Sequence, residues 1–188
     1  MRNLVKCLPL ILTAALFTPI ARAQGAAKPE APKPPDSPSK VLLDSWNDVG
    51  RKLIAMAEDF PEDKYDFKPT PAQRSFAEQL LHAAGSCYYF TNPVMGLKPP
   101  ADDPKREQYK SKADVVAFVK KAFADGAAAI QSKGEKGLMT EVVYYPQQKA
   151  RIIDIAYGII EHSGEHYGQL VVYYRLAGLV PPESRPNK

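Results

Sequence analysis

The segment 151–177 constrains the fold of this chain most strongly. Its core-type residues recur at alternating spacings of four and three, which is the pattern of a helix packed against other helices. These positions are Ile152, Ala156, Ile159, Ser163, His166, Leu170, Tyr173 and Ala177. Gly178 and the two following prolines end the helix. The pattern therefore predicts a long helix in a bundle, with a histidine at the middle of its buried stripe.

Two more amphipathic segments lie in the first half of the chain. The first begins at Ser37 and Pro38, a pair that caps and starts a helix, and it ends before Phe60 and Pro61. The second begins where Ser75 and Glu78 form a capping box, and residues 92–93, Asn-Pro, weaken its end. The loop between these two helices is rich in proline.

A third amphipathic segment lies between these two and the segment 151–177, so four helices are predicted in all. It begins at a second capping box, Ser111 to Asp114, and closes near Gly134. Residues 142–145, Val-Val-Tyr-Tyr, are expected to be briefly extended before the last helix. Four such helices bury their apolar stripes most simply as an all-α four-helix bundle, which we place at residues 39–182 with a tail at 183–188.

The N-terminal residues are predicted to be a secretory leader. Arg2 and Lys6 precede an apolar stretch at 8–20, and an A-x-A cleavage site ends at Ala23. The stretch is too short to cross a bilayer core of about 30 Å. Residues 1–23 are thus a signal peptide that predicts a secreted or periplasmic protein, with no membrane association after cleavage. Residues 24–38 form a proline-rich flexible linker.

Cleavage changes the charge and the cysteine count. Removal of Arg2, Lys6 and Arg22 lowers the formal net charge from +4 to +1. A nearly neutral domain has no long-range attraction for nucleic acid, so no such partner is expected. Cys87 is the cysteine that remains, so no intrachain disulfide is possible.

The chain contains three histidines, and their placement predicts a metal site. His162 and His166 are four residues apart and share one helical face, while His82 lies on the second helix. Three neutral imidazoles with an open position are typical of a catalytic divalent metal site. We expect zinc or nickel, although imidazole also suits copper and iron. The alternative is a set of hydrogen-bonded core histidines.

Two further side chains are candidates for chemistry. Residues 162–166 match the inverted zincin pattern H-x-x-E-H, with Glu165 as a base. That mechanism needs a third ligand well downstream, and Glu183 is the single acidic residue after His166, so a peptidase is not favoured. Glu165 remains a candidate base for another reaction, or a solvated charge. Gln169 is a candidate for orienting a ligand or contacting substrate, or for helix packing.

Three runs of sequence together resemble the DinB/YfiT-like family. They are residues 60–69, residues 75–82 ending at His82, and residues 162–181 beginning at His162. The resemblance implies a four-helix bundle in which His82, His162 and His166 hold a divalent ion, and it suggests a homodimer. Tyr167 stands where many relatives carry arginine, so an anion contact from that position is in doubt.

Members of that family include thiol S-transferases and a thiol-dependent isomerase. The resemblance thus implies a metal-dependent enzyme that activates water or a thiol toward a small-molecule substrate. A non-catalytic bundle that binds a metal or a small ligand is the main alternative. A purely structural ion is the third possibility, and in that case chelation should unfold the protein.

Overall fold

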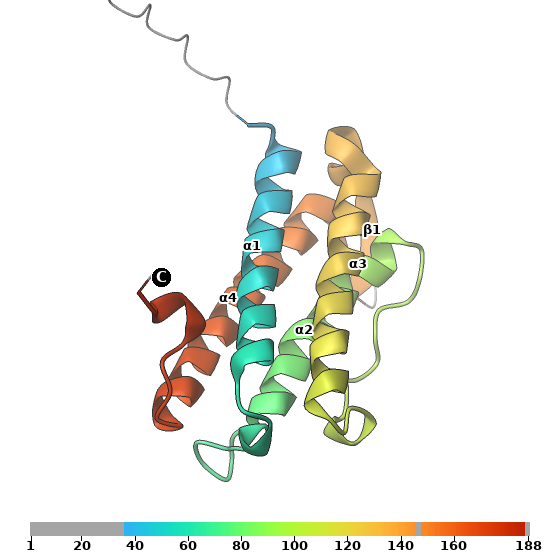
Figure 1. Ribbon diagram of the computed structural model, residues 1–188. Helices are drawn as coiled ribbons and strands as arrows, with labels where there is room; N and C mark the ends of the chain where they lie inside the picture. The colour runs from blue at the N-terminus through green and yellow to red at the C-terminus, as the bar shows by residue number, and fades with distance from the viewer. Residues whose placement is uncertain (1–35, 146–147, 187–188) are drawn as a thin grey trace, which may run out of the picture. The chain divides into compact units, whose positions relative to one another are not determined.

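Four helices pack side by side in the computed structural model, which describes residues 36–145 and 148–186 (Figure 1). α1 and α2 each pack against both α3 and α4. The bounds are Pro38–Asp59 for α1, Phe76–Val94 for α2, Lys112–Leu138 for α3 and Ile152–Leu176 for α4. The predicted all-α four-helix bundle is confirmed. The predicted signal peptide and the linker up to residue 35 lie outside the described residues.

Short elements connect and complete the bundle. A two-stranded antiparallel hairpin, β1 (Glu141–Tyr145) and β2 (Gln148–Arg151), joins α3 to α4. Single 3-10 turns lie in the α1–α2 loop (Glu62–Lys64), in the α2–α3 loop (Arg106–Gln108) and after α4 (Pro182–Ser184). The last of these packs against α1. The hairpin packs against α2 and α4. It therefore covers part of the bundle and does not form a separate layer.

The capping signals read from the sequence form as predicted. The Ser37 side chain accepts a hydrogen bond from the backbone N–H of Lys40 at the start of α1. Reciprocal capping boxes start α2 and α3, and they are made by Ser75 with Glu78 and by Ser111 with Asp114. Each box satisfies backbone N–H groups that the first helical turn leaves without a partner. Local sequence thus sets the starts of α1, α2 and α3, whereas α4 begins after Arg151 without a side-chain cap.

The predicted end of the third helix and the predicted extended segment are confirmed, whereas a further helical turn and the strand β2 were not predicted. Gly134 takes a φ of 57°, which breaks α3 near the expected position, and a further turn runs to Leu138. The extended segment at 142–145 forms part of β1. α2 continues through Pro93 to Val94, because a proline in the last turn removes a single helical hydrogen bond. β2 was not predicted, since residues 148–151 carry no alternation of apolar and polar side chains.

The contact between α1 and α3 is built around Trp46. Its side chain is fully buried, and its Nε1–H donates to the carbonyl oxygen of Phe123 at 2.9 Å. Gly126 lies directly against the indole, because a Cβ placed there would be 1.9 Å from the ring. The glycine is therefore required for the close approach of the two helices.

A second aromatic cluster joins α4 to the end of α1 and the start of α2. Phe60 stacks on Phe76 with ring centroids 3.7 Å apart, and Tyr174 meets both rings edge-on. The Tyr174 hydroxyl donates to the carbonyl oxygen of Met56 at 2.9 Å. This buried hydrogen bond and the ring contacts fix how far α4 is shifted along α1.

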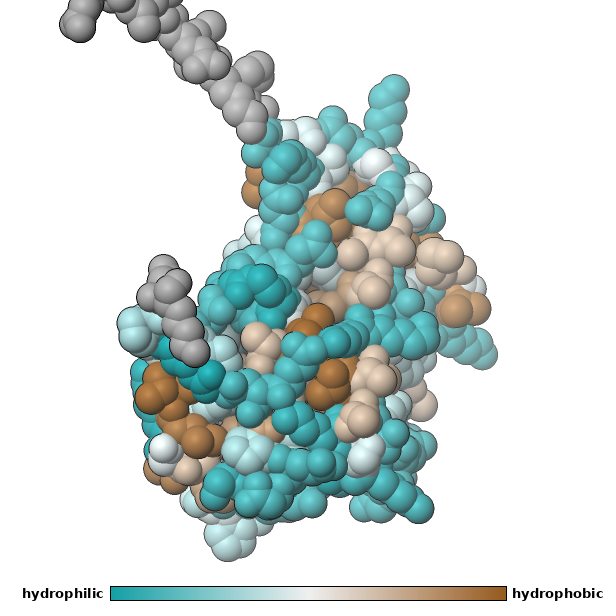
Figure 2. All heavy atoms as spheres, in the orientation of Figure 1, coloured by the Kyte–Doolittle hydropathy of each residue, from teal (hydrophilic) through white to brown (hydrophobic). Residues whose placement is uncertain are grey.

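The surface that α1 and α3 present is mostly hydrophilic, with small apolar areas between charged side chains (Figure 2). Ion pairs between Arg51 and Glu183 and between Asp59 and Arg185 tie the residues after α4 to α1. Among the described residues, none of the helices combines the length and the apolar character needed to cross a membrane.

Gly126→Ala should lower the free energy of unfolding by about 1–3 kcal/mol, because the added methyl overlaps the Trp46 ring and the packed core must shift. Gly164→Ala is the matched control on the exposed side of α4, where no atom lies within 4 Å of the new Cβ. It should raise stability by roughly 0.5–1 kcal/mol, since glycine weakens a helix. Urea unfolding monitored by circular dichroism measures both. Equal effects of the two substitutions would contradict the packing described here.

Candidate metal centre

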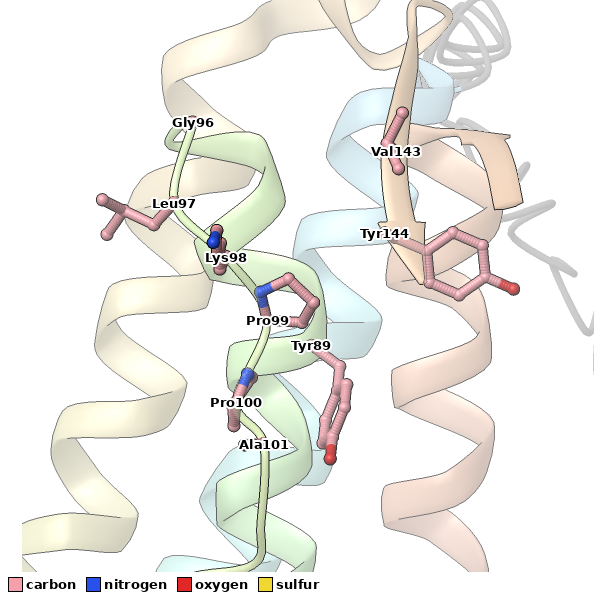
Figure 3. A pocket seen from close by; sticks show the side chains of 9 residues that line it. All are labelled: Tyr89, Gly96, Leu97, Lys98, Pro99, Pro100, Ala101, Val143 and Tyr144. Atoms are coloured by element: carbon pink, nitrogen blue, oxygen red, sulfur yellow. The ribbon is translucent and has the colours of Figure 1, made fainter. Parts of the chain in front are cut away.

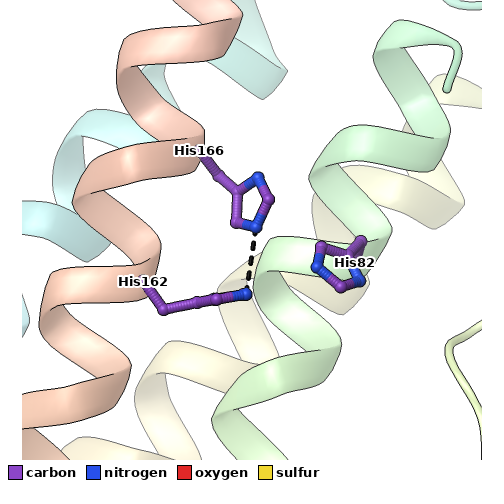
Figure 4. A group of neighbouring side chains, drawn as sticks. All are labelled: His82, His162 and His166. Atoms are coloured by element: carbon purple, nitrogen blue, oxygen red, sulfur yellow. Dashed lines mark hydrogen bonds between the residues drawn. The ribbon is translucent and has the colours of Figure 1, made fainter. Parts of the chain in front are cut away.

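The three histidines come together between α2 and α4 (Figure 4). His82 projects from α2, and His162 and His166 project from consecutive turns of α4. One ring nitrogen from each lies within 4.8 Å of the other two, and the Nε2 atoms of His162 and His166 are 3.0 Å apart. The sequence-predicted ligand residues therefore converge on one point.

The spacing of these nitrogens suits a single ion. Zinc–nitrogen bonds are about 2.0–2.1 Å long, so two ligand nitrogens of a tetrahedral ion lie about 3.3 Å apart. The 3.0 Å between the two α4 histidines is close to this value, and the 4.8 Å span of the group requires a small rotation of one ring. The donor set, three imidazoles, is that of a borderline divalent cation.

Asp103 holds His82 in the form that binds metal. The Nδ1–H of His82 donates to Oδ2 of Asp103, in the loop between α2 and α3, over 2.7 Å. Arg74 lies 3.4 Å from the same oxygen. With the proton on Nδ1, the lone pair of Nε2 is available for an ion, and the carboxylate fixes the orientation of the ring.

The two histidines of α4 have different partners. His166 Nδ1 lies 2.5 Å from the side-chain amide of Gln79, and that amide also contacts Gln169. In this arrangement the Gln79 amide donates to Nδ1. Turning the Gln79 and Gln169 amides together by about 180° presents the Gln79 oxygen to Nδ1–H and lets Gln169 donate to it, which leaves Nε2 for metal. His162 Nδ1 is buried without a hydrogen-bond partner among the described residues. Hydrogen bonding among the described residues therefore satisfies one ring nitrogen of His162, its Nε2, and leaves the other without a partner.

Burial keeps the imidazoles of α4 neutral. The pKa of His166 is lowered to about 4, first by burial and then by the neighbouring His162 and His82. The pKa of His162 is lowered too, first by burial and then by His82. Since neutral imidazole is the metal-binding form, the site is ready for a cation at neutral pH.

A cavity of about 450 Å³ opens beside the histidines, and we call it the triad cavity. His82 and His162 form part of its wall. The other lining residues are Ser86, Tyr89, Asp103, Tyr144, Ala150, Asp154, Ile155, Gly158 and Ile159. An ion held by the histidines would therefore be reachable by a small molecule.

The remaining sequence candidates lie around this group. Glu165 is exposed, and its charge acts on His162 in the direction of a higher pKa. Gln169 accepts a hydrogen bond from Gln79 and so contacts the His166 partner. Cys87 is fully buried and does not belong to the histidine group. Glu183 is ion-paired with Arg51 at 2.7 Å, which removes it from the ligand candidates.

Sequence reasoning missed two residues at the site. Gln79 precedes His82 by three positions, so a glutamine on the ligand face of an apolar helix was a signal that could have found it. Asp103 lies in a polar loop at no fixed spacing from His82, and nothing local distinguishes it from Asp102. Tyr167 lies away from the histidines, beneath the ammonium group of Lys52 at 5.9 Å.

Comparisons with known proteins agree with this architecture. A family model described as the DinB superfamily matches residues 45–170. A DinB-like protein from Bacillus subtilis is 21% identical over 73% of this chain and 92% of its own, with a TM-score of 0.60. One from Bacillus cereus is 19% identical over 76% of this chain and 95% of its own, with a TM-score of 0.63. At these identities the likeness shows the fold. No protein of curated function matches the chain.

Asp103→Asn should weaken metal binding about 10–100-fold, because the amide is a poorer acceptor for the Nδ1–H of His82. Zinc affinity by competition with a chromophoric chelator measures the loss. Asp102→Asn, one residue earlier in the same loop, is the matched control and should leave the affinity unchanged. An equal response of the two variants would remove Asp103 from the site.

Metal-free protein should lose stability on mild acidification. The pKa of His166 is about 4 in the folded chain and near 6.5 when unfolded, so the unfolded chain binds more protons between these values. The contribution of His166 to the free energy of unfolding should therefore be complete above about pH 6.5 and should be lost as the pH drops toward 4. Urea midpoints at pH 7 and pH 5 measure this, and His166→Gln should show a smaller decrease. The same decrease in both proteins would contradict the assignment.

Proposed function

Because this chain belongs to the DinB superfamily, we propose that it is a metal-dependent enzyme whose ion is held by His82, His162 and His166. Zinc or nickel fits three imidazole donors best. When bound, such an ion lowers the pKa of a coordinated water or thiol and so supplies a nucleophile at neutral pH. The substrate is a small molecule with an electrophilic centre.

The opening of the triad cavity onto the histidines carries this proposal. Two of the three ligand residues form part of the cavity wall, so a substrate can reach the ion without any rearrangement of the bundle. The ion-binding residues also lie apart from the Trp46 and Phe60 clusters that hold the helices together. This separation favours a catalytic ion over a structural one.

The other residues at the site would orient and not react. Asp103 sets the proton of His82, and Gln79 sets that of His166. Glu165 and Gln169 remain candidates: Glu165 as a proton acceptor at the exposed edge, and Gln169 as a contact that orients Gln79. The competing function is a bundle that binds a metal or small ligand without turnover.

We further propose that the protein acts outside the cytoplasm as a homodimer, with neither a membrane nor a nucleic acid as partner. The motivating features are the predicted signal peptide at 1–23, the low mature charge and the resemblance to the family. N-terminal sequencing of the native protein should then begin at Gln24. A native protein that begins at Met1 would contradict export.

Mature protein starting at Gln24, loaded with zinc or nickel, should bind one ion per chain and hydrolyse uncharged nitrophenyl esters. His82→Ala, His162→Ala and His166→Ala should each lose the ion and the activity. Metal content by mass spectrometry and ester turnover are measured on the same samples. Chelation should abolish turnover while the helical circular dichroism signal persists.

Each other outcome of that experiment identifies a rival. Ion retention in all three variants would remove the site assignment. A bound ion without turnover of esters or of thiol electrophiles would favour the binding module. Unfolding on chelation would make the ion structural.

A further inference from the structure

The triad cavity is continued by a second cavity of about 600 Å³, which we call the outer cavity (Figure 3). The loop 96–101 lies on one side of it and β1 on the other. Tyr89 of α2 and Tyr144 of β1 line both cavities. The two cavities therefore meet at these tyrosines. The triad cavity reaches the histidines, and the outer cavity reaches the surface.

We propose that the two cavities form one cleft for a substrate with an apolar tail. The reactive group lies at His82 and His162, and a hydrocarbon or aryl tail runs past Tyr89 and Tyr144 into the outer cavity. This inference rests on the proposed function for the reacting end of the substrate. It adds the substrate class and the direction in which the substrate lies.

Apolar side chains line both parts of the cleft. Ile155, Ile159 and Ala150 line the triad cavity, and Leu97, Pro99, Pro100 and Val143 line the outer cavity. Volumes of this size are typical of sites for small molecules. Burying a methylene group is worth about 0.8 kcal/mol, or about a fourfold gain in affinity. A tail of several carbons therefore supplies most of the binding.

The charged side chains at the cleft are already paired or exposed to solvent. Among the described residues that line the triad cavity, the charged side chains other than histidine are Asp103 and Asp154, both of which are acidic. Asp154 is paired with Arg151 at 2.7 Å and Asp103 with His82, so neither needs a ligand to balance it. Lys98 borders the outer cavity but is exposed to solvent. The apolar walls, and not these charges, would therefore select the tail of the substrate.

Gly158 keeps the triad cavity open. It precedes His162 by one helical turn and lines the same wall. No atom lies within 4 Å of the position that a Cβ would take there. Since glycine inside a helix is unfavourable relative to alanine, its place at this wall is consistent with a need for space. A larger side chain at 158 can therefore fill the cavity without displacing the core.

The test uses the zinc-loaded mature protein and the uncharged fluorescent probe N-phenyl-1-naphthylamine. The probe should bind with one-to-one stoichiometry, and alkan-1-ols from butanol to decanol should displace it. Their affinity should rise about two- to fourfold for each added methylene.

Two variants examine the two parts of the cleft. Gly158→Leu should weaken the probe and every alcohol by about tenfold or more while zinc content stays at one ion. Gly164→Leu is its control, because that residue is an exposed glycine of the same helix and lies outside both cavities. The double variant Leu97→Ser, Val143→Ser should keep butanol binding and lose the gain with chain length.

The control for the double variant is Val172→Ser, Leu176→Ser on the outside of α4. These residues are 50% and 60% exposed, against 63% for Leu97 and 54% for Val143, so loss of surface hydrophobicity is matched. Alcohol affinity that does not depend on chain length, or an unchanged Gly158→Leu variant, would overturn the proposal. Probe binding with the expected dependences but no ester turnover supports the cleft and counts against the proposed catalysis.

Discussion

The packing of α2 against α4 is the contact on which the rest of the site depends. His82 meets His162 and His166 only if these two helices keep one register and one rotation about their axes. Aromatic contacts between Phe76 and Tyr174 and the hydrogen bond from the Tyr173 hydroxyl to the carbonyl of Arg74, 2.8 Å long, hold that register at one end. The metal ligands are thus oriented by packing that lies at a distance from them, as rigid sites require.

The interface between these helices is unusual in its polarity. Gln79, Ser163 and His166 are buried there, whereas the α1–α3 contact is formed by Trp46 and its apolar neighbours. A buried polar side chain without a partner lowers stability by about 1–3 kcal/mol, and the Ser163 hydroxyl has no hydrogen-bond partner among the described residues. Polar groups in such a place are explained by function more readily than by folding.

The sequence predicted the parts of the structure that depend on local signals. Ser75 and Ser111 mark helix starts through capping boxes, and the spacing of His162 and His166 places both rings on one face. Asp103 and the strand 148–151 could not be predicted, because the first depends on the path of a long loop and the second on backbone pairing with β1. Only tertiary structure brings these residues to the histidines, and the cavities have no sequence signal at all.

The division of the cleft between helices and connections separates ligand binding from substrate choice. The histidines and their glutamine partner lie on α2 and α4, which the bundle core holds in place. The outer cavity is built largely by the loop 96–101 and by β1, where substitutions and insertions disturb few buried contacts. A change in these two connections can therefore alter which tail fits while the three imidazoles keep their geometry. One bundle can in this way serve different substrates with the same metal chemistry.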